Sequence, residues 1–180
     1  MTSNSPQDKQ HDDILGSDSV ALVASLPVMG AAAKDDPDLL SRSITDLLHL
    51  IREDLAMDMV LVTIHVDDQI VVSHAAAAAE ECNIEGFSHP KELSICQRVL
   101  EGRLPAVIPD MAALKQTHDV PPTPVVPAAF MAVPVILSCG RHYGVLCCLK
   151  STPMPELDEL HHRRLQMSAQ HIARLVDEAG

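Results

Sequence analysis

The sequence is poor in aromatic and basic side chains. Its 180 residues include no Trp, one Tyr and two Phe, and 13 Lys and Arg stand against 25 Asp and Glu, for a formal net charge of -12. Proteins that bind single-stranded nucleic acid use aromatic stacking platforms, and a strongly acidic chain is repelled by phosphate backbones and anionic lipid surfaces. We therefore expect neither nucleic acid nor a membrane among its partners.

Long apolar runs and cysteine motifs are also missing. The longest apolar run near the N-terminus, residues 20–33, is broken by Ser25, Pro27 and Gly30 and follows acidic residues, which is typical of neither a membrane span nor a signal peptide. The five cysteines show no CxxC spacing, which argues against a disulfide framework and a thiolate zinc site. These features favour the reducing cytoplasm.

What remains predicts one domain with an extension. Apolar residues make up 47% of the chain, enough for a core. Residues 1–35 lack sustained periodicity, so we expect a mobile N-terminal extension there and a domain at residues 36–180. The predicted elements are a helix capped by Asp36 and running from Pro37 to Leu55, strands at 59–66 and 69–73, a helix from Ser94 to Leu100, strands at 106–108, 130–137 and 142–149, and a helix at 156–176.

The connections decide the fold class. The alanine run at 75–79 and the polar stretch to Pro90 are predicted to be loop with at most a short helix. Four prolines restrict residues 111–127 to a long loop with at most a short helical piece. Strands joined by hairpins pair antiparallel, and the helices at both ends can share one sheet face, so the class is α+β with a central antiparallel sheet.

Three segments carry a family resemblance. Residues 96–110, CQRVLEGRLPAVIPD, resemble the middle of GAF domains of the kind that precede cyclic-di-GMP-turnover domains in bacterial signalling proteins. MAVPV at 131–135 and YGVLCC at 143–148 resemble the last two strands of that family. The resemblance covers roughly residues 37–178. It implies a sensor without enzymatic activity, with the terminal helices on one sheet face and the short helix and long loop on the other.

The special chemistries of the family are not matched. Cyclic-nucleotide GAF domains carry an Asn-Lys pair, but neither Asn4 nor Asn83 is followed by Lys, and no Cys precedes a His as in bilin attachment. Free methionine sulfoxide reductases, which resemble GAF domains, use a catalytic Cys and a resolving Cys in the long loop. Cys96 has no such partner within residues 111–127, so this enzyme stays the weaker alternative.

The implied pocket lies between the sheet, the Ser94 helix and the Pro-rich loop. Its candidate lining residues are Thr63, His65, Cys96, Asp110, Phe130 and Met131. Thr63 and His65 share a strand face, which either lines the pocket or lies near a strand end in water. Cys96 is either a thiol activated by the first helical turn or a small buried residue.

Other conspicuous residues have structural interpretations. Adjacent Cys147 and Cys148 point to opposite sides of a strand and are predicted to be core. The carboxylates near His161 and His162 have metal-ligand spacing but favour a solvated helix face, so no metal site is predicted. No cofactor can be identified.

We expect a stand-alone sensor that binds a small molecule or a signalling partner. The alternative is an interaction adaptor with a filled core and no ligand, and a cavity of a few hundred Å³ with convergent polar groups would distinguish the two. A homodimer through the first and last helices is also expected, because Leu39-Leu40 and Leu47-Leu48 widen the apolar stripe and Met167 and Ala173 lie off the main line of the last helix.

Overall fold

The computed structural model describes residues 37–79, 84–123 and 125–180. The predicted extension at 1–35, the cap at Asp36 and Cys82 lie outside these ranges. In chain order the elements are α1 (Pro37–Asp54), β1 (Met59–Val66), β2 (Gln69–Ala77), β3 (Ser88–Pro90), the 3-10 turn η1 (Lys91–Leu93), α2 (Ile95–Leu100), β4 (Val107–Ile108), α3 (Met111–Leu114), β5 (Ala129–Ile136), β6 (His142–Lys150) and α4 (Glu159–Ala179).

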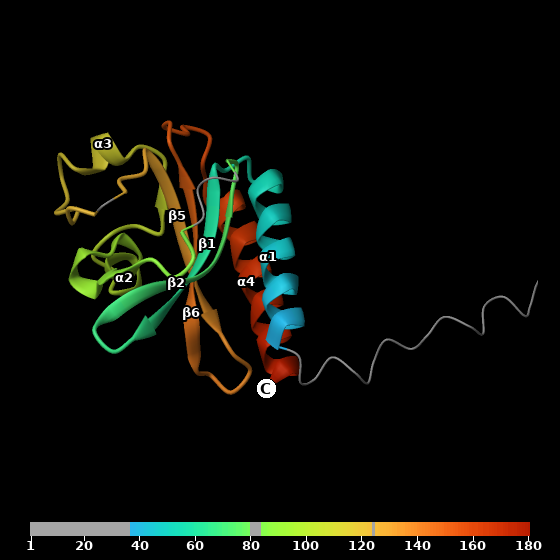
Figure 1. The fold of residues 1–180 in the computed structure, drawn as a ribbon. Coiled ribbons are helices and arrows are strands. Elements are labelled where there is room, and N and C mark those ends of the chain that lie inside the picture. The colour runs from blue at the N-terminus through green and yellow to red at the C-terminus, as the bar shows by residue number, and fades with distance from the viewer. Residues whose placement is uncertain (1–36, 80–83, 124) are drawn as a thin grey trace, which may run out of the picture. The chain divides into compact units, whose positions relative to one another are not determined.

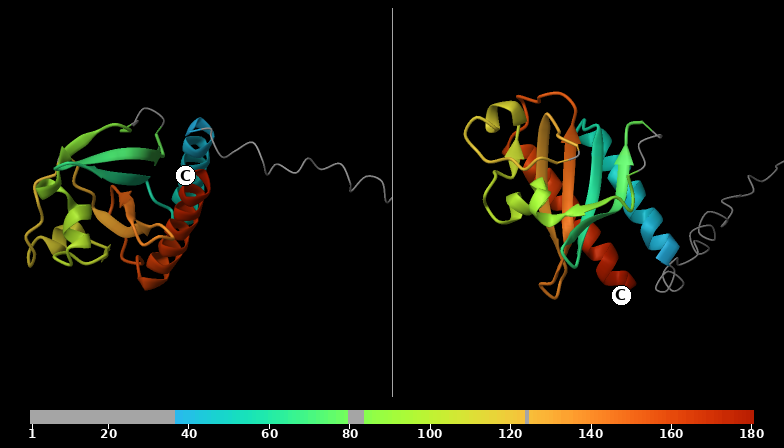
Figure 2. Two further views of the ribbon diagram at one scale, coloured as in Figure 1. Left: turned by 90° about the horizontal axis from the view of Figure 1, so that it is seen from below. Right: turned by 60° about the vertical axis from the view of Figure 1, so that its left-hand side comes forward.

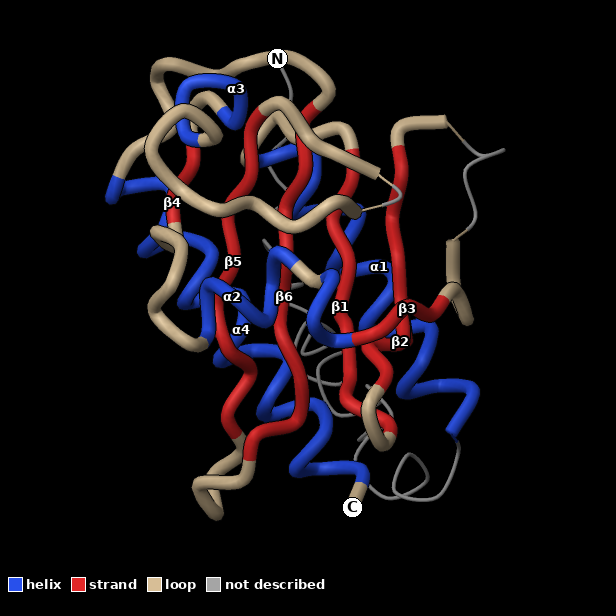
Figure 3. Tube along the Cα trace, turned by 90° about the vertical axis from the view of Figure 1, so that its left-hand side faces the viewer, coloured by secondary structure: helices blue, strands red, loops and turns tan. Residues whose placement is uncertain are grey.

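The described strands form one sheet of six in the order β3-β2-β1-β6-β5-β4, and each neighbouring pair is antiparallel. Helices α1 and α4 lie side by side against one face, while α2, α3 and the long loop between α3 and β5 lie over the other (Figures 1 and 2). Figure 3 looks onto this second face, with α2 in front of the strands and α4 behind them. The α+β class and the division of helices between the two faces are confirmed.

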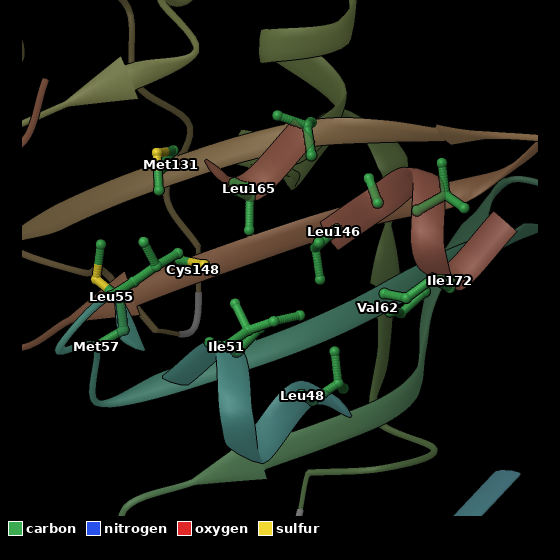
Figure 4. Close-up of a cluster of buried hydrophobic side chains, with 14 of the residues drawn as sticks. Leu48, Ile51, Leu55, Met57, Val62, Met131, Leu146, Cys148, Leu165 and Ile172 are labelled. Atoms are coloured by element: carbon green, nitrogen blue, oxygen red, sulfur yellow. The ribbon is translucent and has the colours of Figure 1, made fainter. Parts of the chain in front are cut away.

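The first core lies between the sheet and the pair α1 and α4. Buried positions 44, 48 and 51 of α1 recur at helical spacing and meet every second residue of the central strands. The labelled members in Figure 4 are Leu48, Ile51, Leu55, Met57, Val62, Met131, Leu146, Cys148, Leu165 and Ile172. Full burial of one such Leu or Ile contributes about 1.5–3 kcal/mol, so this cluster supplies much of the stability.

The second core lies on the opposite face, under α2. Its sheet members include Leu61, Phe130 and Cys147. The residues next to each of them in sequence point to the opposite face of the sheet and pack in the first core. Cys147 and Cys148 therefore belong to different cores, which confirms that they point to opposite faces and are buried. Strands β1, β5 and β6 have no solvent face along much of their length.

Two segments that were predicted to be loop are strands in the structure. β2 continues past Ser73 to Ala77, because the alanines pair with the first half of β1, with Met59 opposite Ala77. Alanine has a low β-propensity, and the pairing that overrides it is not local. Residues 88–90, also predicted to be loop, form β3 on the outer edge of β2.

A β-bulge interrupts β2 at Ser73. Val62 and Thr63 are consecutive in β1 but lie opposite residues two apart in β2, so Ser73 has no partner in the ladder. The extra residue exchanges the faces of the strand: Val72 packs in the second core, whereas Ala76, an even number of residues later, packs in the first.

Capping residues set the ends of the helices. Ser94 caps α2 as predicted, with its hydroxyl accepting a hydrogen bond of 3.2 Å from the backbone N–H of Gln97. Helix α4 begins at Glu159 rather than at Glu156, because the Asp158 carboxylate accepts hydrogen bonds from two backbone N–H groups of its first turn. No helix in the described ranges has the length and apolar character needed to span a bilayer.

Gly144 marks a close approach between β6 and β1. A methyl group here would overlap the carbonyl oxygen of Thr63, a backbone atom that cannot rotate away. We expect Gly144→Ala to lower the free energy of unfolding by about 3 kcal/mol, the upper end of the usual cost of overpacking. Urea unfolding followed by circular dichroism measures the loss.

Gly102→Ala is the matched control for this variant. Gly102 has a φ of +70° and no atom near the added methyl group, so only the strain of a left-handed backbone is introduced, about 1 kcal/mol. Equal losses in the two variants would contradict the close approach at Gly144.

Candidate functional site

A pocket of about 110 Å³ lies on the second face of the sheet. Residues of β1, β2, β5 and β6 line it together with the start of α2, the long loop and the segment that leads into β3. The lining residues are Met59, Leu61, Thr63, Val72, Ile84, Phe87, His89, Ser94, Ile95, Cys96, Thr123, Val125, Pro127, Phe130, Cys147 and Leu149. Among these described residues there is no Asp, Glu, Lys or Arg, so the pocket is apolar and uncharged.

An ion pair fastens the long loop to α2 beside the pocket. Arg98 donates from Nη1 to Oδ2 of Asp119 at 2.6 Å and to the backbone oxygen of the same residue at 2.7 Å. The hydrogen bond from Arg98 holds the pKa of the Asp119 carboxyl below its usual value. At the start of the loop segment, the Asp110 carboxylate caps α3 by accepting hydrogen bonds of 2.9 and 3.1 Å from two backbone N–H groups.

Two polar side chains of the pocket lack hydrogen bonds of ordinary strength. The hydroxyl of Thr63 is buried and is left without an oxygen or nitrogen partner. Nδ1 of His89 has no partner either, and burial lowers the pKa of this imidazole, so it is neutral at pH 7. A buried polar group left unsatisfied costs about 1–3 kcal/mol. Both atoms are therefore unsatisfied within the protein.

Two thiols meet where α2 approaches β6. The Sγ atoms of Cys96 and Cys147 lie 2.7 Å apart. Burial raises the pKa of the Cys147 thiol well above its usual value, the adjacent Cys96 adds to this effect, and the Thr63 hydroxyl opposes it weakly. Cys147 is therefore a neutral thiol at physiological pH.

The structure brings together half of the residues predicted for the site. Those that line the pocket are Thr63, Cys96 and Phe130. Met131 points instead to α1 and α4, within the first core (Figure 4). His65 is exposed beyond the pocket, where it borders a separate hollow with Tyr143, and Asp110 is an exposed helix cap.

Sequence reasoning missed Cys147 and His89 as pocket residues. Cys147 was assigned to the core, and only the strand register, which places it opposite Leu61 of β1, shows that its face is the one that lines the pocket. His89 lies on β3, in a stretch that was predicted to be loop, so no face could be assigned to it. Neither residue carries a local sequence signal for its role.

No metal centre is found in the part of the chain that the structure describes, where no group of three or more His, Cys, Asp and Glu side chains is placed to hold an ion. The imidazole of His161 instead makes a hydrogen bond of 2.7 Å to Asp158, within the cap of α4. His162 lies 3.6 Å from the Glu159 carboxylate in the next pair along the same turn.

Solved structures share this fold at low sequence identity. The GAF domain of an Acinetobacter phosphoenolpyruvate-protein phosphotransferase has a TM-score of 0.61 and 13% identity, over 78% of this chain and 83% of that one. The second GAF domain of DevS from Mycobacterium smegmatis has a TM-score of 0.58 and 15% identity, over 80% and 95%. The chromophore-binding domain of a bacteriophytochrome from R. palustris has a TM-score of 0.61 and 16% identity, over 82% and 56%. These likenesses establish the fold.

Sequence comparison adds the family. A search of curated proteins finds no match. The family profile described as GAF domain, however, matches residues 41–177, a range that includes all the strands above, α2 and α3, and all but the outer ends of α1 and α4. Since the profile covers most of the chain and the fold agrees with it, the protein belongs to the GAF domain family.

Proposed function

We propose that this GAF domain is a sensor whose pocket binds a small, uncharged and largely apolar molecule. GAF domains are sensory and regulatory modules that bind small molecules, and in general they are not enzymes. The observation that carries the proposal is the buried Thr63 hydroxyl, left without an ordinary hydrogen bond in an apolar pocket. A ligand that supplies the missing partner offsets the cost of that burial.

Size and charge narrow the class of ligand. The volume of about 110 Å³ does not reach the few hundred Å³ that would distinguish a sensor from an adaptor. It is close to the cavity of about 150 Å³ that holds benzene in another protein, so the proposal is restricted to a ligand of that size. Without an ionised lining residue, a charged ligand would lose its hydration without compensation. The rim is apolar as well, since Phe87 and Val125 are 44% and 60% exposed.

The sheet links this pocket to the helices on its other face. Thr63, Phe130 and Cys147 line the pocket from strands whose neighbouring residues pack against α1 and α4. A ligand that shifts these strands would alter the helix pair, where a signalling protein or a second copy of the chain can respond. The proposed location is the cytoplasm, supported by the free thiols at the four described cysteines.

Phenol and toluene are matched probes of the pocket, since they have similar size and differ in one hydroxyl. We expect both to raise the melting temperature, phenol at lower concentration, because only phenol can bond to Thr63. At ten times its Kd a ligand adds about 1.4 kcal/mol of stability, or roughly 4 °C. Benzoate, the charged relative, should give no shift in differential scanning fluorimetry.

Thr63→Val tests the hydroxyl with little change of shape. The variant should keep its affinity for toluene and bind phenol about tenfold more weakly, while the unliganded domain becomes about 1 kcal/mol more stable because an unsatisfied group is removed. A wild type that binds none of the probes, with a crystal structure in which side chains fill the pocket, would contradict the sensor and support the adaptor.

We further propose that the chain forms a homodimer through the outer faces of α1 and α4. Leu39 and Leu50 of α1 are exposed, and eleven residues is close to three helical turns, so they share one face. Leu160 and Met167 of α4 are 63% and 69% exposed and lie two turns apart on one face. Ala173, which the sequence placed on this strip, is buried against the sheet. Of the leucine pairs expected to widen the stripe, Leu48 is buried too and Leu40 and Leu47 pack against the first core.

Met167→Glu places a charge in that face. We expect the wild type to be a dimer at micromolar concentration by light scattering, and the variant to raise the dimer Kd at least about tenfold, since a buried unpaired charge is costly. Gln116→Glu adds the same charge after α3 and should leave the dimer intact. A wild type that stays monomeric at all concentrations would refute this arrangement.

A further inference from the structure

The contact between Cys96 and Cys147 joins two elements that are distant in sequence. The residues are 51 positions apart, one in the first turn of α2 and the other in the middle of β6. Their Sγ atoms are 2.7 Å apart, within the van der Waals contact of two sulfurs, and a disulfide bond is about 2.05 Å long. The two sulfurs are therefore within about 1 Å of bonding distance.

Both sulfurs belong to residues that line the pocket, which gives a small molecule a route to them. Cys148 follows Cys147 but faces α1 and α4, so it cannot reach Cys96 across the sheet. Cys139 is exposed in the turn between β5 and β6. Among the described cysteines, the geometry thus selects a single pair.

We propose that Cys96 and Cys147 are a reversible redox pair, which a small hydroperoxide entering the pocket oxidises to a disulfide. This inference goes beyond ligand sensing and does not require that a ligand bind. The disulfide would fasten α2 to the sheet at the pocket, so oxidation would fix the layer that the proposed ligand contacts.

The chemistry proceeds in two steps. The Cys96 thiolate attacks the terminal oxygen of the hydroperoxide, the O–O bond breaks, and the leaving alkoxide takes a proton to become an alcohol, or water if the oxidant is hydrogen peroxide. Cys96 is now a sulfenic acid. The Cys147 sulfur attacks Sγ of Cys96, the S–O bond breaks, and hydroxide leaves with the Cys147 proton as water. Two thiols and one hydroperoxide thus give one disulfide, one alcohol and one water.

The order of the two cysteines follows from their burial. Cys96 is 9% exposed and Cys147 is fully buried, so an oxidant in the pocket meets Cys96 more readily. Burial raises the pKa of the Cys147 thiol and keeps it protonated, so the first attack falls to Cys96. Cys147 loses its proton to the leaving hydroxide only in the second step, when the sulfenic sulfur of Cys96 lies against it. The pocket volume of about 110 Å³ admits hydrogen peroxide and excludes a molecule as large as glutathione disulfide.

Peptide mapping after oxidation tests the pair. In a Cys82→Ser, Cys139→Ser background, one equivalent of hydrogen peroxide should remove two hydrogens per chain in the intact mass. Trypsin should then release residues 92–98, ELSICQR, linked to residues 142–150, HYGVLCCLK. Dithiothreitol should separate the peptides. The disulfide closes the chain between Cys96 and Cys147 into a loop, which should raise the melting temperature by about 10 °C. Glutathione disulfide at the same concentration should oxidise the pair on the order of tenfold more slowly than hydrogen peroxide does.

Cys147→Ala and Cys148→Ala form a matched pair of controls, because they are neighbours on one strand with opposite faces. The cross-link should vanish in the first and persist in the second. If a variant fails to fold, mass-spectrometric fragmentation of the linked wild-type peptides between residues 147 and 148 shows which of the two cysteines is bonded to Cys96. A cross-link through Cys148, or oxidation of the background protein by addition of oxygen without a cross-link, would overturn the proposal.

Discussion

The central strands of the sheet are buried on both faces, and this constraint organises the rest of the domain. β1, β5 and β6 pass between α1 and α4 on one side and the layer of α2 and the long loop on the other. Each residue along these strands must therefore suit one of two cores, and a polar side chain on either face needs a partner. Thr63 is the buried exception on the second face of these strands, and it lines the pocket.

Features with local causes could be predicted from the sequence. The cap at Ser94, the helical spacing within α1 and the β5–β6 hairpin are set by residues a few positions apart, and each appears where expected. The alanine half of β2 could not be found, because its pairing with β1 overrides a weak propensity. The helix α4 begins three residues later than predicted because the Asp158 carboxylate caps it there.

The same distinction applies to the candidate site. That Thr63, Cys96 and Phe130 line one pocket could be predicted, because the family resemblance implied how the sheet, the helix and the loop are arranged. Phe130 and Met131 are consecutive in β5, so strand alternation alone excludes one of them from any single pocket, and the structure shows which. The contact of Cys96 with Cys147 depends on how α2 settles on β6, and no pattern along the chain encodes that distance.

The bulge at Ser73 has a consequence for how this domain can vary. Because one unpaired residue separates the two halves of β2, the half with Val72 and the half with Ala76 are out of phase by one position. Deleting one residue here would place the side chains of the alanine half on the opposite face of the sheet. Side chains this small would do little to prevent that change. The count of residues between Val72 and Ala77 is thus under tighter constraint than their identity. Related chains should therefore preserve the length of this segment even where they replace its alanines.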